Sequence, residues 1–292
     1  MNKVKILTDS TSDLYKVPER NLYEEMDLDV IPLYISLGDK NYRDGIDLVP
    51  EEMYELVEKE KQLPKSSCNS PEEYMAFFKK YLDQGYDIVF MGIGGELSAS
   101  YRVASLVAEE FPKGRVFVVD SANLSSGTGL LLYYAHQLRE QGKSAAEIAE
   151  AVSKIKSRVR TSFVIDTLDY LHKGGRCSGM AKVIGTLLSL KPLIQVVDGK
   201  LVVAAKSRGK KNGLNTMINN FRVDWEANNV WTDRIMITHT VNMEEALYIH
   251  GKLLEMGVPK SSIVFSEAGC VICAHCGPKC IGILYLLKED NR

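Results

Sequence analysis

Short apolar runs alternate with amphipathic stretches along the first half of the chain. Each apolar run is followed by a polar loop, and then by a stretch whose apolar residues recur at helical spacing. The strands expected in this half are residues 4–7, 30–37, 87–91 and 115–120. Because the order strand, loop, helix repeats, the pattern predicts an α/β fold with a mostly parallel sheet.

The second half of the chain has a different pattern. Residues 193–197 and 201–205 are apolar runs that flank Asp198-Gly199, which is a strong signal for a two-residue hairpin. Further strands are expected at residues 234–238 and near Ile263 and Ile283. Since a hairpin brings antiparallel strands into the sheet, this half predicts a mixed sheet.

The chain has 292 residues, which is long for a single core, so two domains are expected. We place the boundary near residue 160, after a helix that Ser144 and Glu147 start. Residues 1–160 are predicted to form an N-terminal α/β lobe with a mostly parallel, Rossmann-like sheet. Residues 161–292 are predicted to form a C-terminal α/β lobe with a mixed sheet flanked by helices.

The stretch of residues 163–192 joins the two predicted lobes. A β-type run enters a short helix, which a Gly-Gly pair stops, and Ser178 then caps a second predicted helix. The apolar residues of this second helix share one face; they are Met180, Val183, Ile184, Leu187 and Leu188. Arg176 and Lys191 bracket it, which indicates either two solvated cations or a hinge that presents charge at the junction.

Composition narrows the class of partner. The formal net charge is −2, so no global field would draw nucleic acid or an anionic membrane to this chain. No apolar run approaches the roughly 18 residues that a membrane helix needs, so no stable membrane insertion is expected. The N-terminus has no signal-peptide pattern, and six cysteines without a leader indicate reduced thiols in a cytoplasm.

Two polar loops follow predicted strands. Residues 8–13, Thr-Asp-Ser-Thr-Ser-Asp, stand at the strand end where ligands of α/β sheets bind, although Ser12 or Asp13 would also serve as a helix cap. Residues 92–98 form a glycine-rich loop before a helix, which is a candidate anion site. Neither this loop nor residues 174–179 has the spacing of a dinucleotide fingerprint or a P-loop, so nucleotide binding is poorly supported.

Spare hydroxyls precede another helix. Ser70, Pro71 and Glu73 form a capping box with proline at the first helical position. Ser66 and Ser67 are not needed for that cap and remain as two hydroxyls on the preceding loop. A basic run at residues 206–211 is typical of a solvated loop, with a docking patch as the alternative.

The cysteines near the C-terminus raise a second kind of chemistry. Cys270, Cys273, Cys276 and Cys280 have the spacing of bacterial ferredoxins. Against an iron–sulfur site, Ile281 stands where those proteins have proline, and the chain has no second quartet. We expect reduced thiols packed around a strand and a turn, with no metal.

Taken in order, these segments resemble the DegV family, bacterial proteins related to the fatty-acid-binding subunits of a fatty acid kinase. The matching pieces span nearly the whole chain. They are residues 8–13, 66–67, 70–71, 97–101, 119–121, 168–176 and 191–192, Arg208, His275, and residues 277–278.

The resemblance implies two α/β lobes with a long-chain fatty acid between them, its tail in an apolar tunnel and its carboxylate near the junction. The residues implied around the carboxylate are Ser66, Ser67, Gly94, Gly95, Ser98 and His275. Arg208 would face a fatty acid kinase subunit, which phosphorylates the carboxylate. This chain itself would be no enzyme and would need no cofactor.

The sequence departs from the family pattern at four places. Ser66 replaces a threonine and keeps the hydroxyl, while Asn69 replaces a proline and Lys279 a glycine. Residues 94–96, Gly-Gly-Glu, replace a Ser-Ser-Gly-like turn. If Glu96 pointed into the site, it would oppose a carboxylate ligand.

The physics of a fatty acid fits these residues. Burying its carboxylate needs several donors, which serine hydroxyls, loop amides and a helix N-terminus supply. A tail of ~15 methylenes at roughly 0.8 kcal/mol each dominates the affinity. Two alternatives stay open: an acyl-ester hydrolase using a serine and His275, although no G-x-S-x-G elbow is present, and an iron–sulfur or metal protein using residues 270–280.

Overall fold

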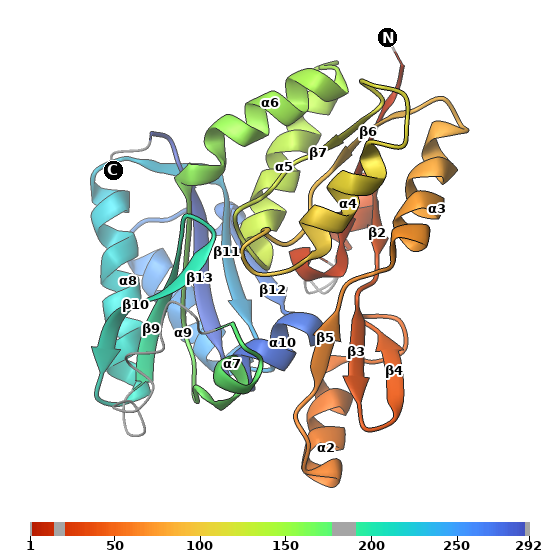
Figure 1. Ribbon diagram of the computed structural model, residues 1–292. Helices are drawn as coiled ribbons and strands as arrows, with labels where there is room; N and C mark the ends of the chain where they lie inside the picture. The colour runs from red at the N-terminus through yellow and green to blue at the C-terminus, as the bar shows by residue number, and fades with distance from the viewer. Residues whose placement is uncertain (1, 15–20, 177–190, 290–292) are drawn as a thin grey trace.

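The computed structural model describes residues 2–14, 21–176 and 191–289, which form two α/β lobes (Figure 1). The predicted α/β class with a parallel and a mixed sheet is confirmed. The helix predicted after Ser178 lies outside the described residues. No helix in the described part of the chain is both long enough and apolar enough to cross a membrane.

The N-terminal lobe contains a parallel sheet in the order β2-β1-β6-β7. Its strands are β1 (Val4–Asp9), β2 (Leu28–Ile31), β6 (Asp87–Phe90) and β7 (Val116–Val118). Helices α3 (Pro71–Leu82) and α4 (Ser100–Ala108) bury apolar side chains on one face of this sheet. Helices α5 (Ser126–Glu140) and α6 (Ala145–Ile155) cover the other face. The capping boxes predicted at Ser70 and Ser144 are confirmed.

A small antiparallel sheet extends from this lobe, and it corrects the expected strand at residues 30–37. That segment is two strands in different sheets, β2 and β3 (Tyr34–Leu37). Pro32 separates them because it has no N–H to donate to a ladder, and its carbonyl accepts from the Asn69 side chain. Strand β3 pairs with β4 (Lys40–Arg43) and with β5 (Lys65–Ser67). Ser66 and Ser67 therefore lie on an edge strand and not on a loop.

The C-terminal lobe contains a mixed six-stranded sheet in the order β10-β9-β8-β13-β11-β12. Its strands are β8 (Val159–Val164), β9 (Lys191–Val197), β10 (Lys200–Ser207), β11 (Val230–His239), β12 (Ile263–Glu267) and β13 (Ile281–Leu287). The predicted β9–β10 hairpin is confirmed, and its turn residues Asp198 and Gly199 have φ of 50° and 78°. Only the β11–β12 pair is parallel among the described strands of this sheet.

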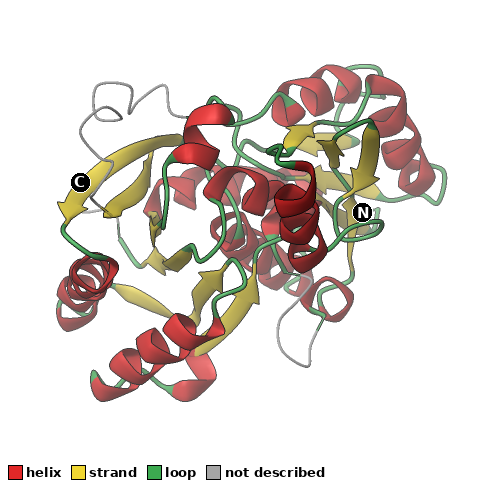
Figure 2. Ribbon diagram, turned by 90° about the horizontal axis from the view of Figure 1, so that it is seen from below, coloured by secondary structure: helices red, strands yellow, loops and turns green. Residues whose placement is uncertain are grey.

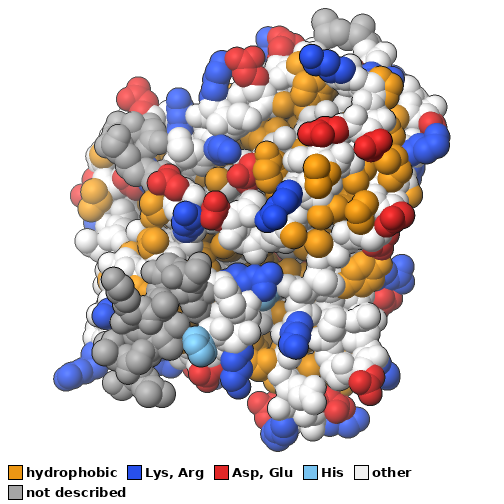
Figure 3. Space-filling view, in the orientation of Figure 1, with side chains coloured by type: hydrophobic (Ala, Val, Ile, Leu, Met, Phe, Trp, Pro, Cys, Tyr) orange, Lys and Arg blue, Asp and Glu red, His pale blue; other side chains and the backbone are white. Residues whose placement is uncertain are grey.

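Helices separate and flank the two sheets. Helices α8 (Lys210–Glu226) and α9 (Met243–Glu255) pack on one face of the C-terminal sheet. Helix α5 contacts β1 on one side and β8, β11 and β13 on the other, so it lies between the lobes (Figure 1). Figure 2 shows helices packed around the strands of both lobes. Short elements complete the fold; they are α1 (Leu22–Glu25), α2 (Pro50–Glu60), α7 (Asp169–Lys173) and α10 (Cys270–Cys276). Acidic and basic side chains are interspersed over the face shown in Figure 3.

Helix α10 corrects the expectation that the cysteines pack around a strand and a turn. Cys270, Cys273 and Cys276 lie on this short helix, and Cys280 follows it. The helix forms because two carboxylates of the other lobe accept the backbone N–H groups at its start. All four thiols are buried and free of disulfides. Among the described residues, no group of three or more His, Cys, Asp or Glu could hold a metal ion.

The two carboxylates at the start of α10 belong to Asp13 and Asp44 of the N-terminal lobe. Asp13 accepts from the Gly269 amide at 2.8 Å and Asp44 from the Cys270 amide at 2.7 Å. Ser125 donates to Asp13, and Ser10 donates to Asp44 at 2.8 Å. This pair is called the α10 clamp below. Both residues are buried, 2% and 3% exposed, so these partners replace most of the water that a surface carboxylate would contact.

The α10 clamp explains the polar loop at residues 8–13. Asp13 joins the lobes, while Asp9 accepts from the Thr11 amide at 3.1 Å and from the Ile93 amide at 3.0 Å. This loop is therefore structural. Burial raises the pKa of Asp9 and Asp13, and it raises the pKa of Asp44 to about 6.

Replacing Asp44 by alanine should destabilise the protein, because the Ser10 hydroxyl and the Cys270 amide lose their acceptor. We expect the free energy of unfolding at pH 7, measured with urea, to fall by about 1–3 kcal/mol. Asp39→Ala, at an exposed turn, is the control and should leave it unchanged. A stability of Asp44→Ala equal to that of the parent would refute the clamp.

The Asp44→Asn variant tests the pH dependence. The folded-state pKa of Asp44 is raised from 3.8 to about 6, so the native state binds more protons than the unfolded state between these values. The contribution of Asp44 to stability is therefore largest below pH 4 and declines as the pH rises to about 6. Asparagine should remove this decline.

Candidate functional site

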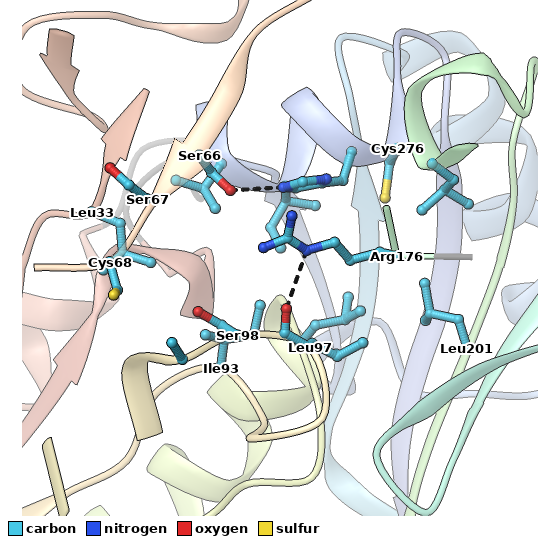
Figure 4. A pocket seen from close by; sticks show the side chains of 16 residues that line it. Leu33, Ser66, Ser67, Cys68, Ile93, Leu97, Ser98, Arg176, Leu201 and Cys276 are labelled. Atoms are coloured by element: carbon cyan, nitrogen blue, oxygen red, sulfur yellow. Dashed lines mark hydrogen bonds between the residues drawn. The ribbon is translucent and has the colours of Figure 1, made fainter. Parts of the chain in front are cut away.

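A cavity of about 250 Å³ lies where the lobes meet (Figure 4). Its walls come from β5, the loop after β6, the end of α7, β10 and α10. Eight large aliphatic residues make half of the lining; they are Leu33, Ile93, Leu97, Leu124, Leu171, Leu201, Val271 and Ile272. The other lining residues are Ser66, Ser67, Cys68, Ser98, Ala99, Arg176, His275 and Cys276. The cavity thus combines an apolar wall with a few polar groups.

Four of the predicted site residues meet at this cavity. Ser66, Ser67, Ser98 and His275 all line it, although Ser66 and His275 are 209 positions apart in the sequence. The Ser66 hydroxyl and His275 Nε2 are 2.7 Å apart, which is a direct hydrogen bond between the lobes. Ser98 precedes α4, where its hydroxyl lies 3.0 Å from that of Ser100.

His275 is a neutral donor in this arrangement. Burial, followed by the positive charge of Arg176, lowers the pKa of His275 to about 4. Its Nδ1 is buried and has no hydrogen-bond partner among the described residues. A Cβ on Gly174 would lie 2.3 Å from this atom, so glycine is what lets the ring occupy the position.

The environment of Nδ1 favours the tautomer that carries the proton on Nε2. A buried N–H without an acceptor costs about 1–3 kcal/mol, so the proton belongs on Nε2. Nε2 then donates to the Ser66 oxygen, and the Ser66 O–H remains free to donate into the cavity. In a serine hydrolase the ring accepts from the serine and a third group orients it through Nδ1, and no such group bonds Nδ1 of His275 among the described residues.

Arg176 is the site residue that the pattern analysis missed. Its Nε donates to the Leu97 carbonyl at 3.2 Å and its Nη1 to the Gly174 carbonyl at 2.7 Å. These bonds hold a guanidinium at the cavity, close to Ser66 and Leu97 in Figure 4. The charge of Arg176, directly after Gly174-Gly175, is visible in the sequence. There it indicates a solvated cation or a charged hinge and not a ligand site.

The expected role of Gly94 and Gly95 is not supported by their positions. Neither residue lines the cavity. The Gly94 amide donates to the Asn123 carbonyl at 2.8 Å, and the Gly95 amide donates to the Asp120 carboxylate at 3.0 Å. Both amides therefore have partners within the N-terminal lobe, and the serine side chains are the donors that remain on this side of the cavity.

Glu96 does not enter the cavity either. Its carboxylate lies 3.6 Å from the Lys200 ammonium at the β9–β10 turn, and both side chains are more than half exposed. An exposed pair of this kind contributes about 0–1 kcal/mol, so it is a weak contact between the lobes. Glu96 therefore does not oppose an anion bound beside Ser66.

A second cavity, of about 280 Å³, lies beside the α10 clamp. Five acidic residues line it, and none of its described lining residues is a lysine or arginine; the acids are Asp13, Glu24, Asp29, Asp44 and Glu267. This lining would repel an anion. An anionic ligand with an apolar body therefore fits the first cavity, which has Arg176 and no carboxylate among its described lining residues.

A mostly apolar cavity with a few convergent polar groups is typical of a protein that binds a small molecule. The DegV family model, described as "Uncharacterised protein, DegV family", matches residues 3–288. This chain therefore belongs to the DegV family.

Similar proteins cover the chain almost completely. A DegV domain-containing protein of Clostridium acetobutylicum is 32% identical over 288 residues, with 99% of this chain and 100% of the relative covered. The solved structure of a fatty-acid-binding DegV family protein from Thermus thermophilus has a TM-score of 0.89 and 30% identity, covering 98% of this chain and 100% of that one. A stearic-acid-binding protein from Eubacterium ventriosum has a TM-score of 0.86 and 26% identity, covering 98% of each chain.

Proposed function

We propose that this chain binds a long-chain fatty acid in the cavity between its lobes. The observation that carries the proposal is the composition of that cavity, where Ser66, Ser98, neutral His275 and Arg176 face an otherwise apolar wall. The similar structures from Thermus thermophilus and Eubacterium ventriosum, described as fatty-acid-binding and stearic-acid-binding, support it.

The polar end of the cavity suits a carboxylate. Hydrogen bonds to a charged group contribute about 1.5–3 kcal/mol each. The Ser66 O–H is free because His275 donates to its oxygen, and the Arg176 guanidinium supplies the opposite charge. Ser67 and Ser98 add two further hydroxyls on the same cavity. These groups together offset the cost of removing the carboxylate from water.

The apolar wall suits the hydrocarbon tail. A buried methylene contributes about 0.8 kcal/mol, so a tail of several methylenes contributes more than any single polar contact of the head. We infer that the tail supplies most of the affinity and that the polar end sets the orientation.

We further propose that this chain is not itself an enzyme and that it presents the bound carboxylate to a fatty acid kinase. The surroundings of His275 Nδ1 support the first part, because no group among the described residues orients the ring as the third member of a hydrolase triad does. Arg208 would contact the kinase. It is exposed directly after β10, and it does not line the cavity. Its backbone carbonyl accepts from Asn212 at 2.8 Å, while its side chain makes no hydrogen bond or ion pair with another described residue.

Replacing Ser66 by alanine should weaken fatty acid binding without unfolding the protein. We expect the Kd for palmitate or oleate to rise about tenfold to a hundredfold, because one hydrogen bond to the carboxylate is lost. Displacement of a fluorescent fatty acid measures it. The control is Ser153→Ala, since the Ser153 hydroxyl donates to the Ala149 carbonyl on α6, away from the cavity. The proposal fails if neither the parent nor the variant binds either acid.

Replacing Arg208 by alanine should separate binding from presentation. The Kd for the fatty acid should stay within twofold of the parent value, while the kinase-dependent phosphorylation of the bound acid should fall at least tenfold. Arg222→Ala, an exposed arginine near the other end of α8, should change neither quantity. An equal loss of both by Arg208→Ala would place that residue on the ligand side.

A further inference from the structure

A small void continues the cavity on its apolar side. It has a volume of about 20 Å³, which is little more than the space that one water molecule needs. Leu124, Ile272 and Cys276 line both the cavity and this void, so they form the boundary between them. None of the polar residues Ser66, Ser67, Ser98, Arg176 and His275 lines the void, which therefore borders the apolar part of the lining.

The loop that carries Leu124 is held rigidly. Its neighbours Ala122 and Ser125 have positive φ of 48° and 54°, a conformation that side-chain-bearing residues adopt only when their surroundings impose it. The Asn123 side chain accepts from the Leu124 amide at 3.1 Å and from the Thr161 hydroxyl at 2.7 Å. These bonds hold the backbone of Leu124 in place at the boundary.

Helix α10 forms the other part of the boundary, and it is also held in place. Ile272 and Cys276 are four residues apart on α10, so they share one face of that helix. The α10 clamp holds the start of the helix. A hydrogen bond with Cys280, followed by burial, raises the pKa of the Cys276 thiol, which keeps it uncharged. It therefore packs as a small apolar side chain.

The void beyond the boundary suits hydrocarbon, because most polar atoms of its lining have partners within the protein. His239 lines it too, and its Nδ1 accepts from the Asn242 amide at 3.2 Å. The Thr161 hydroxyl donates to Asn123, and the Thr240 hydroxyl donates to the Gly277 carbonyl at 2.7 Å. The Thr238 and Ser126 hydroxyls form a hydrogen bond with each other, and the Ser125 hydroxyl donates to the Asp13 carboxylate. These hydroxyls are therefore engaged within the protein, while Phe163 and Leu284 supply apolar surface.

We propose that Leu124, packed opposite Ile272 and Cys276, sets the length of the acyl chain that this protein accepts. The inference rests on the proposed function, and it concerns the far end of the same ligand. A tail gains affinity for each methylene that enters the cavity, and the gain stops where the tail reaches Leu124. Removing the Leu124 side chain joins the cavity to the void and moves that stop to a longer chain.

The experiment measures the Kd of straight-chain saturated fatty acids of increasing length, by displacement of a fluorescent fatty acid. For the parent protein, the Kd should fall about fourfold with each added methylene, since a buried methylene contributes about 0.8 kcal/mol. Beyond a break length the Kd should stop falling. For Leu124→Ala the break should lie at a length longer by about two or three methylenes, the size of the deleted side-chain end.

Two further variants supply a smaller truncation at Leu124 and a control elsewhere in the cavity. Leu124→Val removes less of the side chain and should move the break in the same direction by a smaller amount. Leu33→Ala, next to Ser67 and Cys68 in Figure 4 and absent from the lining of the void, should weaken all acids without moving the break. A thermal unfolding curve for each variant shows that the protein is folded.

Three results are possible, and each has a different meaning for the inference and for the proposed function. A break at a longer chain in both Leu124 variants supports the inference. An unchanged break in variants that are folded and bind fatty acids overturns it while leaving the proposed function intact. Absence of binding by the parent protein at every chain length overturns the proposed function itself.

Discussion

The docking of the two lobes depends on two buried carboxylates of the N-terminal lobe. They accept hydrogen bonds from the start of helix α10 in the C-terminal lobe. Asp13 and Asp44 accept the first amides of α10, and the same helix carries His275 and three further lining residues of the cavity. A short helix has unsatisfied amides at its start, and here their acceptors come from a strand end and a loop distant in sequence. The cavity therefore exists only when the lobes are docked, since its walls come from both.

The same constraint explains why the site relies on hydroxyls and a neutral ring. His275 reaches Ser66 across the lobe junction, and burial together with Arg176 keeps it uncharged. A neutral imidazole that donates to Ser66 turns that hydroxyl toward the cavity. Arg176 then supplies the only positive charge among the described lining residues. Such a site complements one carboxylate, and the apolar remainder complements a hydrocarbon.

Local signals made much of this predictable from the sequence. The capping box at Ser70 and the Asp198-Gly199 turn each depend on adjacent residues, and both form as predicted. Strand β5 has only three residues, too few for a periodic pattern, so Ser66 was assigned to a loop. The helix of Cys270–Cys276 depends on acceptors that are more than 200 positions away, which no local pattern shows. Arg176 was visible as a charge, but its place in the cavity follows from the packing of the lobes.

The central claim is that this cavity holds one fatty acid by its carboxylate and its tail. Native mass spectrometry of the purified chain tests it most directly, before and after extraction with organic solvent and after adding palmitate. The account predicts a mass excess of one fatty acid per chain, which extraction removes and palmitate restores. A chain that has its bare mass throughout, and takes up no palmitate, would contradict it.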